Sequence, residues 1–237
     1  MSEDTLARFD ANPEQSFTLP GAYYHDPQVY GREMPAIFHR TWQYACHVSL
    51  LAAPGDYFVR DIGDQSVVVL RQNDGELRAF HNVCQHRAHR LVEGRSPLDG
   101  RGQSPGVVIC PYHGWTYELG GDLKHAPNSD RVAGFDKAAI CLSPVRLDSL
   151  CGFVFVNLDP ACRPLAKQFK GLAKRMAPYF DDDLKLISEQ RREFACNWKL
   201  AGRAYLENLS PPFARSDGRR VGKGGRSRWG PAQSKKT

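Results

Sequence analysis

The chain has 237 residues, of which 41% are hydrophobic and 24% charged, as is typical of a soluble globular protein with a sizeable core. No apolar run approaches the length of a transmembrane helix, and the acidic N-terminus lacks the apolar segment of a secretory signal, so we expect a cytoplasmic protein without a membrane partner. The net charge of +6 suggests nucleic acid, but eight basic residues and one acid lie in 211–237, and the remainder carries a net charge of −1. Nucleic-acid binding is therefore not expected.

Residues 22–50 combine helix formers with aromatics, and Asp26 followed by Pro27 predicts a helix start. From residue 57 the pattern changes to short runs rich in β-branched and aromatic residues, which predict strands. The runs are YFVRDI at 57–62, SVVVLRQ at 66–72 and LRAFHNV at 77–83. Asp74 and Gly75, between the last two runs, predict a hairpin turn.

Residues 94–106 have the Gly, Ser and Pro content of a flexible loop. Strand-like runs return after it, and they are GVVICPY at 106–112, GWTYELGG at 114–121 and CGFVFVNLD at 151–159. Together with the earlier runs, they predict an α+β fold that is mainly antiparallel β.

Helical periodicity appears at 163–180, where one face carries apolar side chains, namely Leu165, Phe169, Leu172 and Met176. Residues 184–208 predict a strand that leads into a helix. Residues 211–237 have almost no apolar periodicity, so we expect them to be disordered.

The seven cysteines are odd in number and scattered, unlike the pattern of a disulfide-stapled secreted domain. We expect reduced thiols, some of them free to bind metal. Two of them have a histidine close by in the sequence, in Cys84-x-His86 and Cys110-x-x-His113, and each pair follows a predicted strand. Two tight loops could therefore enclose a metal centre.

Two kinds of centre suit two thiolates and two imidazoles: a tetrahedral zinc ion, or a 2Fe–2S cluster with the cysteines on one iron and the histidines on the other. Zinc fingers usually pair Cys with Cys and His with His along the chain, whereas each loop here contributes one of each. The mixed pattern favours the cluster, and zinc is the alternative.

The segments NVCQHRAHRL and CPYHGWTYELGGDL resemble the two halves of the Rieske motif in α subunits of ring-hydroxylating non-haem iron oxygenases. Other segments resemble the same family in the expected order, including CGFVFVNLD and CNWKLA, so the resemblance covers roughly 22–208. It implies four parts, which are an N-terminal helical segment at 1–40, a Rieske 2Fe–2S domain at 41–160, the incomplete start of a helix-grip-type catalytic domain at 161–210 and a disordered basic tail at 211–237.

The resemblance implies that Cys84, His86, Cys110 and His113 bind the 2Fe–2S cluster. Without the disulfide of the cytochrome bc-type branch, the potential is expected to be low, suited to electrons from a reductase. Trp115 is expected either to cover the irons or to pack in the core. The implied partners are an NAD(P)H-dependent reductase, with or without a ferredoxin, and, in the complete form, two further copies in a homotrimer.

The family also implies a mononuclear Fe(II) held by two histidines and a carboxylate. Glu207 matches the acidic position that links a cluster histidine of one subunit to the iron of its neighbour, but Ser210 and Arg215 stand where the histidines belong. Arg offers no lone pair. The eight histidines lie at 25, 39, 47, 81, 86, 89, 113 and 125. As written, the chain therefore lacks the ligands of the mononuclear iron.

A truncation or a frameshift would explain this departure. Leu209, Ser210 and Pro211 can be encoded so that a one-base shift after Asn208 reads Tyr-His, as the family requires. Resequencing tests this hypothesis.

We therefore expect a Rieske 2Fe–2S oxidoreductase of the α-subunit type, from a ring-hydroxylating or demethylating mono- or dioxygenase. Its cluster would pass single electrons to a mononuclear iron that this chain lacks, so the chain as written would not oxygenate a substrate by itself. The alternative is a stand-alone Rieske-type electron-transfer protein. The residues before the cluster motif and the CNWKLA segment after it favour the oxygenase.

Overall fold

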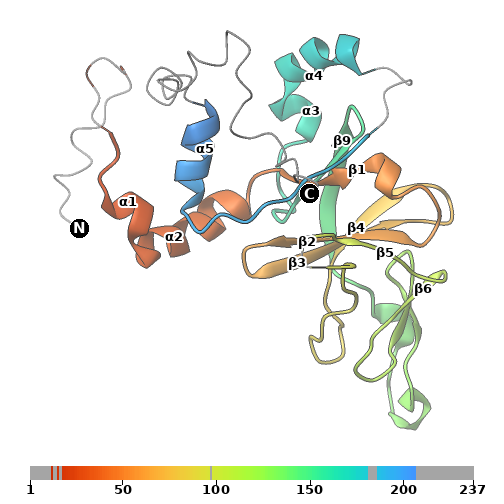
Figure 1. Cartoon of the computed structure of the whole chain (residues 1–237). Helices are drawn as coiled ribbons and strands as arrows, with labels where there is room; N and C mark the ends of the chain where they lie inside the picture. The colour runs from red at the N-terminus through yellow and green to blue at the C-terminus, as the bar shows by residue number, and fades with distance from the viewer. Residues whose placement is uncertain (1–11, 13–14, 16–17, 97, 181–185, 207–237) are drawn as a thin grey trace, which may run out of the picture. The chain divides into compact units, whose positions relative to one another are not determined.

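The computed structural model describes residues 12, 15, 18–96, 98–180 and 186–206 (Figure 1). The chain divides into two compact units, one of them Gln28–Arg192 and the other combining Met1–Pro27 with Glu193–Thr237. Each unit is described by itself. The larger unit contains both Cys/His motifs.

A seven-stranded antiparallel sheet forms the body of the larger unit (Figure 1), in the order β1-β10-β9-β4-β3-β2-β5. Its strands are β1 (Gln43–His47), β2 (Asp56–Ile62), β3 (Gln65–Arg71), β4 (Leu77–His81), β5 (Arg101–Gln103), β9 (Pro144–Leu150) and β10 (Phe153–Asn157). The turn between β3 and β4 contains Gly75, whose φ of 85° is the left-handed conformation that glycine adopts without a steric penalty. The predicted Asp74-Gly75 hairpin is confirmed.

A smaller three-stranded sheet, in the order β6-β7-β8, lies beyond one end of the larger sheet (Figure 1). Its strands are β6 (Val107–Ile109), β7 (Thr116–Glu118) and β8 (Leu123–His125). Strands β6 and β7 are antiparallel, with Val107 opposite Glu118 and Ile109 opposite Thr116. The second Cys/His motif is the connection of this hairpin.

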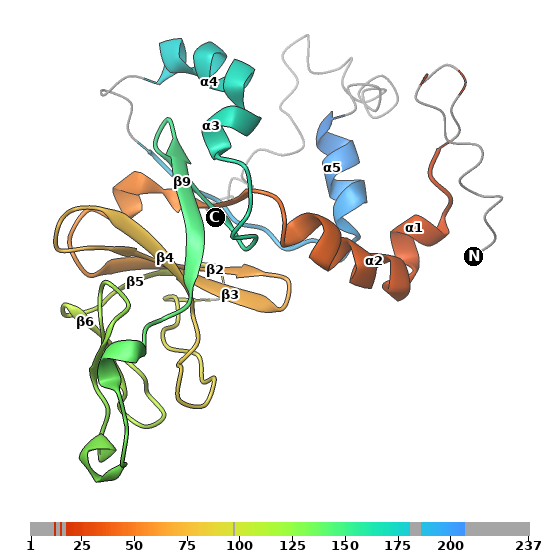
Figure 2. The ribbon, with the colours of Figure 1, turned by 180° about the vertical axis from the view of Figure 1, so that it is seen from behind.

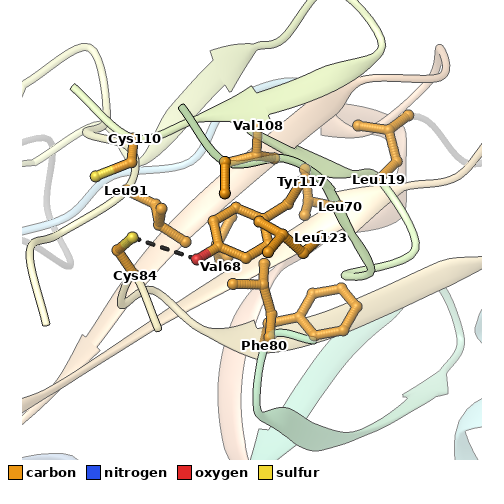
Figure 3. Packing of buried hydrophobic residues seen from close by; sticks show 12 residues of the cluster. Val68, Leu70, Phe80, Cys84, Leu91, Val108, Cys110, Tyr117, Leu119 and Leu123 are labelled. Atoms are coloured by element: carbon orange, nitrogen blue, oxygen red, sulfur yellow. Dashed lines mark hydrogen bonds between the residues drawn. The ribbon is translucent and has the colours of Figure 1, made fainter. Parts of the chain in front are cut away.

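Strand β3 is buried on both faces, because it lies between two hydrophobic clusters. Val67 and Val69 belong to the cluster on one face, with Phe58 and Val154. The alternate residues of β3, Val68 and Leu70, belong to the other cluster. That second cluster fills the space between the two sheets, and its further members are Phe80, Cys84, Leu91, Val108, Cys110, Tyr117, Leu119, Leu123, Ala126 and Leu142 (Figure 3). Both predicted cluster cysteines are therefore part of a hydrophobic core.

The helices of the larger unit are short. They are α2 (Pro27–Glu33), a π-helical turn (Met34–Phe38), α3 (Leu165–Gln168), α4 (Lys170–Met176) and 3₁₀ turns at Val48–Leu50, Ser129–Arg131, Lys137–Ala139 and Ala177–Tyr179. Figure 2 shows α3 and α4 beside β9. The Leu165 amide donates to Asp148 of β9 over 3.2 Å, and Phe169 packs on Phe155 of β10 with ring centroids 6.5 Å apart.

The smaller unit contributes α1 (Ala22–His25) and α5 (Trp198–Leu206) to the described residues. No helix among the residues that the structure describes is long and apolar enough to cross a bilayer.

The predicted fold class, α+β with mainly antiparallel β, is confirmed, but several local predictions are wrong. Residues 43–47, for which no strand run was identified, form β1, and residues 101–103 of the predicted flexible loop form β5 at the sheet edge. The helix over 163–180 is broken after Gln168, and the described residues 186–192 form no strand. Pairing with distant strands decides the first two cases. The predicted four-part domain division is untested and stays a prediction.

Candidate metal centre

Residues 82–93, which we name the first ligand loop, follow strand β4, whereas residues 110–115, the second ligand loop, connect β6 and β7. Each loop closes on its cysteine in the same way. The Cys84 amide donates to the His89 carbonyl over 2.8 Å, and the Cys110 amide to the Trp115 carbonyl over 2.7 Å, each five residues ahead.

A second hydrogen bond is repeated as well. The amides of Ala88 and Gly114 donate to the carbonyls of Cys84 and Cys110, both over 3.0 Å. These two donors, each four residues after its cysteine, have left-handed backbones, with φ of 53° for Ala88 and 73° for Gly114. The two loops therefore present their Cys and His from matching frames.

The four predicted ligands lie in two pairs, a buried pair of thiols and a pair of imidazoles of which His86 is half-buried and His113 exposed. Cys84 and Cys110 are each 2% exposed. The rings of His86 and His113 lie 4.9 Å apart between centroids, with planes 69° apart, and His113 is exposed. Thus the thiols lie in the core and the imidazoles at the surface.

This arrangement distinguishes between the two kinds of centre. A single tetrahedral zinc ion requires all four ligands to converge on one point. A two-iron cluster instead needs two thiolates on one side and two imidazoles on the other. The residues therefore fit a 2Fe–2S cluster better than zinc.

Tyr117, from β7, holds the first ligand loop from inside the core. Its hydroxyl oxygen accepts the Gln85 amide over 3.0 Å and lies 3.2 Å from the Cys84 sulfur (Figure 3). Because that oxygen already accepts a backbone N–H, its own proton is free to point at the sulfur. Burial raises the pKa of Cys84, the hydrogen bonds from Tyr117 and the His86 backbone lower it, and the adjacent Cys110 thiol raises it.

Aromatic residues cover the histidines. Trp115 stacks on His86, with ring centroids 4.9 Å apart and planes 8° apart, and it also packs against the core, so the expected core packing is confirmed and a role in covering the irons stays a prediction. Tyr112 lies on His113 with centroids 3.7 Å apart, and its other neighbour is His89 at 5.3 Å. Burial lowers the pKa of His86, and the charges of His113 and Arg87 add to this. Lowered pKa values favour the neutral imidazole that binds a metal.

Glu207, the predicted bridging carboxylate, lies outside the described residues, as do Ser210 and Arg215. None of the seven cysteines is in a disulfide. Cys46 is fully buried in β1, and His47 and His81 are half-buried on strands of the larger sheet. His89, one of the histidines outside the motif, lies against Tyr112 and is exposed.

Sequence analysis missed three residues that support the ligands: Asn82, Arg90 and Tyr117. The signal for Tyr117 was the alternation along β7, which places it inward between Thr116 and Glu118, and a buried hydroxyl requires a partner. Nothing in the sequence identified the strand partners of Asn82 and Arg90, which are Ser66 on β3 and Asp61 on β2.

Comparison with known proteins agrees with this geometry. Residues 41–136 match the model of the Rieske 2Fe-2S domain. The chain contains a Rieske domain. The cofactor of such a domain is a 2Fe–2S cluster, as predicted.

Related proteins extend the similarity beyond this domain. The carnitine monooxygenase oxygenase subunit of Escherichia coli (strain K12) is 39% identical over 201 residues, which are 84% of this chain and 52% of the relative. The glycine betaine monooxygenase oxygenase subunit of Chromohalobacter salexigens is 37% identical over 202 residues, 84% of this chain and 43% of the relative.

Among solved structures, a quaternary ammonium Rieske monooxygenase in complex with L-carnitine superposes with a TM-score of 0.80 at 36% identity, covering 90% of this chain and 59% of that one. The predicted resemblance to α subunits of Rieske non-haem iron oxygenases is confirmed. The chain spans about half the length of the curated relatives that it matches.

Proposed function

We propose that this chain is the cluster-bearing part of an oxygenase α subunit whose substrate is a quaternary ammonium compound. The observation that carries the redox part is the pairing of two buried thiols with two neighbouring imidazoles, one half-buried and one exposed. A bound 2Fe–2S cluster supplies reversible transfer of one electron at a time. The chain's own residues would hold it with Cys84 and Cys110 on the core side and His86 and His113 on the open side.

The surrounding side chains suit such a role. Trp115 stacks on one imidazole and Tyr112 on the other, so each ring is held in orientation and partly shielded from water. Tyr117 places a hydroxyl proton at the Cys84 sulfur, where it stabilises negative charge on the thiolate. The imidazole edges remain at the surface, where an electron donor or acceptor can approach.

The proposed substrate class rests on the relatives. Those with 37–39% identity are named for carnitine and glycine betaine, both quaternary ammonium compounds. We therefore favour a monooxygenase acting on such a compound over the hydroxylation of an aromatic ring, which the sequence motifs alone left open.

The proposed partners are an NAD(P)H-dependent reductase, directly or through a ferredoxin, and, in the complete form of the subunit, two further copies in a homotrimer. One solved relative is described as revealing inter-subunit electron transfer. We propose the same route here, with Glu207 as the bridging carboxylate and the mononuclear iron supplied by a complete subunit.

Purification of the protein from its native host, with whatever chains accompany it, would test this function. We expect two iron and two sulfide ions per chain, a Rieske electron paramagnetic resonance (EPR) signal on reduction, and NAD(P)H and O₂ consumption that depends on carnitine, glycine betaine or choline but not on naphthalene. The stand-alone carrier, our second candidate, predicts the same signal without any substrate-dependent O₂ consumption. Absence of the signal would contradict both functions.

A further inference from the structure

The first ligand loop has no strand partner of its own, and side chains hold it instead. Strand β4 ends at His81, and the twelve residues of the loop after it contribute only an isolated bridge between Val83 and Arg90 to strand pairing. The second ligand loop, by contrast, is closed by the backbone ladder of β6 and β7. Something else must therefore fix Cys84 and His86 relative to Cys110 and His113.

Asn82 closes the base of the first ligand loop. Its side chain, in a residue that is 2% exposed, donates to the Val92 carbonyl over 2.8 Å and accepts the Val92 amide over 3.1 Å, as a strand neighbour would. The same amide nitrogen lies 3.2 Å from the Ser66 hydroxyl of β3, and the backbone amide of Asn82 donates to the Ser66 carbonyl over 2.9 Å. Asn82 thus ties both ends of the loop to β3.

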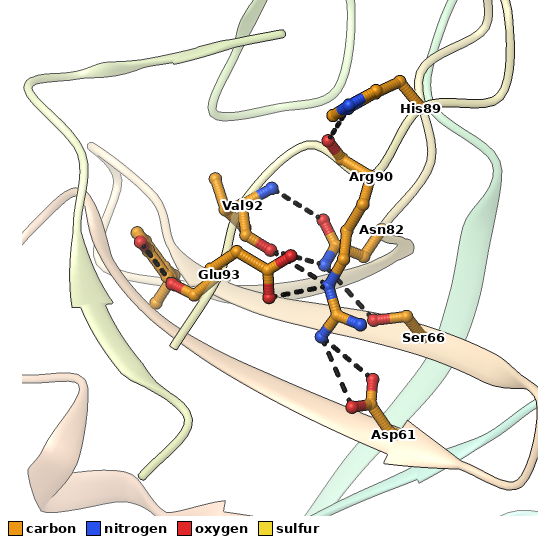
Figure 4. A network of polar contacts seen from close by, with 8 residues as sticks. Asp61, Ser66, Asn82, His89, Arg90, Val92 and Glu93 are labelled. Atoms are coloured by element: carbon orange, nitrogen blue, oxygen red, sulfur yellow. Dashed lines mark hydrogen bonds and ion pairs between the residues drawn. The ribbon is translucent and has the colours of Figure 1, made fainter. Parts of the chain in front are cut away.

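Arg90 ties the same loop to β2 (Figure 4). One guanidinium nitrogen, Nη2, lies 3.0 and 3.3 Å from the two carboxylate oxygens of Asp61. Its Nε lies 3.1 Å from the Glu93 carboxylate, within the loop itself. The Arg90 carbonyl accepts the ring N–H of His89 over 2.6 Å, and His89 in turn lies against Tyr112 of the second loop. Arg90 therefore connects the sheet, the first loop and the aromatic contact between the loops.

We propose that Asn82 and Arg90 are positioning residues for the cluster, which fix the first ligand loop to β3 and β2 so that Cys84 and His86 stay aligned with Cys110 and His113. This inference rests on the proposed function in taking these four side chains as cluster ligands. It predicts that the loop loosens, and the cluster is lost faster, when the Arg90 contacts are removed while the rest of the fold persists.

The main variant is Arg90→Leu, which keeps an apolar side chain at this position and removes the guanidinium group. Arg101→Leu is the matched control, because Arg101 also pairs with a carboxylate, that of Asp99 at 2.7 Å, but within its own segment and without a tie to a ligand loop. Arg90→Lys should fall between wild type and Arg90→Leu, since an ammonium keeps the positive charge but lacks the planar, pre-organised geometry of the guanidinium.

The first readout needs no cluster. In the apo chain of Arg90→Leu, hydrogen exchange should be faster at the amides of Cys84 and Ala88, while the matching amides of Cys110 and Gly114 exchange as in wild type. Because apo Arg90→Leu is compared with the apo wild-type chain, this measurement tests the anchoring even if the wild-type chain binds no cluster. Failure of the wild-type chain to bind a cluster would instead contradict the proposed function.

The second readout is cluster retention. With the neutral chelator 2,2′-bipyridyl, we expect Arg90→Leu to lose iron roughly tenfold faster than wild type, the usual scale for removing an outer-sphere support. The EPR line shape of the remaining reduced clusters should broaden and their midpoint potential should shift, neither of which a merely structural contact would produce. Arg101→Leu should stay within about twofold of the wild-type rate, because its ion pair contributes little and, unlike the pairs of Arg90, has no tie to a ligand loop.

Salt adds a further discriminating test. The side chains of Arg90, Asp61 and Glu93 are 34%, 49% and 73% exposed, so added salt screens their attraction. Wild type and Arg101→Leu should lose iron faster as NaCl is raised, whereas Arg90→Leu should not respond.

If Arg90→Leu fails to fold, the double variant Asp61→Asn, Glu93→Gln removes the same charge pairs and keeps the shapes of all three side chains. Exchange and iron loss at the Arg101→Leu level in either folded variant would overturn the proposal.

Discussion

The two ligand loops have the same internal frame and different supports. In both loops the backbone amide four residues after the cysteine donates to the cysteine carbonyl. The cysteine amide donates to the carbonyl five residues after it. The second loop inherits its position from the β6–β7 ladder, whereas the first depends on side chains from β2 and β3. Equivalent geometry at a metal centre can thus be reached by backbone pairing or by side-chain anchoring. A single substitution can remove a side-chain anchor but leaves the backbone pairing largely intact.

Aromatic side chains of the β6–β7 hairpin also contact the first ligand loop. Tyr112, Trp115 and Tyr117 all come from 110–118, and their contacts in the first loop are His89, His86, and Cys84 with Gln85, respectively. The contacts between the loops therefore come mainly from one side, and the following predictions test this asymmetry.

The largest effect should be the same for both loops. Cys84→Ser and Cys110→Ser should each abolish the reduced-cluster EPR signal, because a serine hydroxyl replaces a thiolate ligand. Cys141→Ser, at an exposed thiol, should keep the full signal and serves as the control. A cluster that survives in only one of the two variants would show that the loops are not equivalent as ligands.

A third buried thiol, Cys46, provides a reference away from both loops. Burial, with Glu189 nearby, raises its pKa from 9.0 to about 12. The unfolded chain then loses this proton first, so the free energy of unfolding should fall as pH rises from 9 to 12, by on the order of 4 kcal/mol in total. Urea titrations of Cys46→Ala at a series of pH values should lack this part of the slope of unfolding free energy against pH. An unchanged slope would exclude Cys46 as its source.

Substitutions at the two residues with left-handed backbones should change the stability of the chain by a smaller amount, and differently in the two loops. Gly114→Ala should destabilise the chain by about 1 kcal/mol through backbone strain, since the added Cβ would meet Pro127 only at 3.6 Å, an ordinary contact. Ala88→Gly should change stability by less than about 1 kcal/mol, because relief of strain offsets the entropy of an unfolded glycine. Denaturant midpoints measure both, and a costless Gly114→Ala would contradict the idea of strain there.

The smallest effect should come from the contact between the loops inside the core. Tyr117→Phe removes the hydroxyl from the Cys84 sulfur and the Gln85 amide, at about 1 kcal/mol. Loss of a hydrogen bond to sulfur should lower the midpoint potential by on the order of tens of mV. Tyr112→Phe, an exposed tyrosine of the same hairpin, is the control for redox titration, and an equal shift in both variants would argue against the role of Tyr117.

Local signals predicted most of the fold. The Asp74-Gly75 turn and the runs of β-branched residues located β2, β3 and β4, because hairpins depend on neighbours in sequence. Strand β1 was missed since its partner, β10, lies more than a hundred residues away, with Gln43 opposite Val156. Strand β5 was missed because Arg101 and Gly102 have no strand preference of their own and pair with β2 only in the folded sheet.

The candidate site divides in the same way. The spacing of Cys84 with His86, and of Cys110 with His113, predicted two loops that meet, and the two histidine rings do lie 4.9 Å apart between centroids. The anchors of the first loop could not be predicted, because the partners of Arg90 and Asn82 depend on the register of β2 and β3.

The short connection of the β6–β7 hairpin has a consequence for the order of events during folding. A hairpin that closes between residues as near as Val107 and Glu118 forms within roughly microseconds, whereas contacts across a sheet with distant strands come later. Cys110 and His113 should accordingly be in place before Cys84 and His86 are. We expect Cys110 and His113 to be available to iron and sulfide early in folding, and Cys84 and His86 only after the larger sheet has formed.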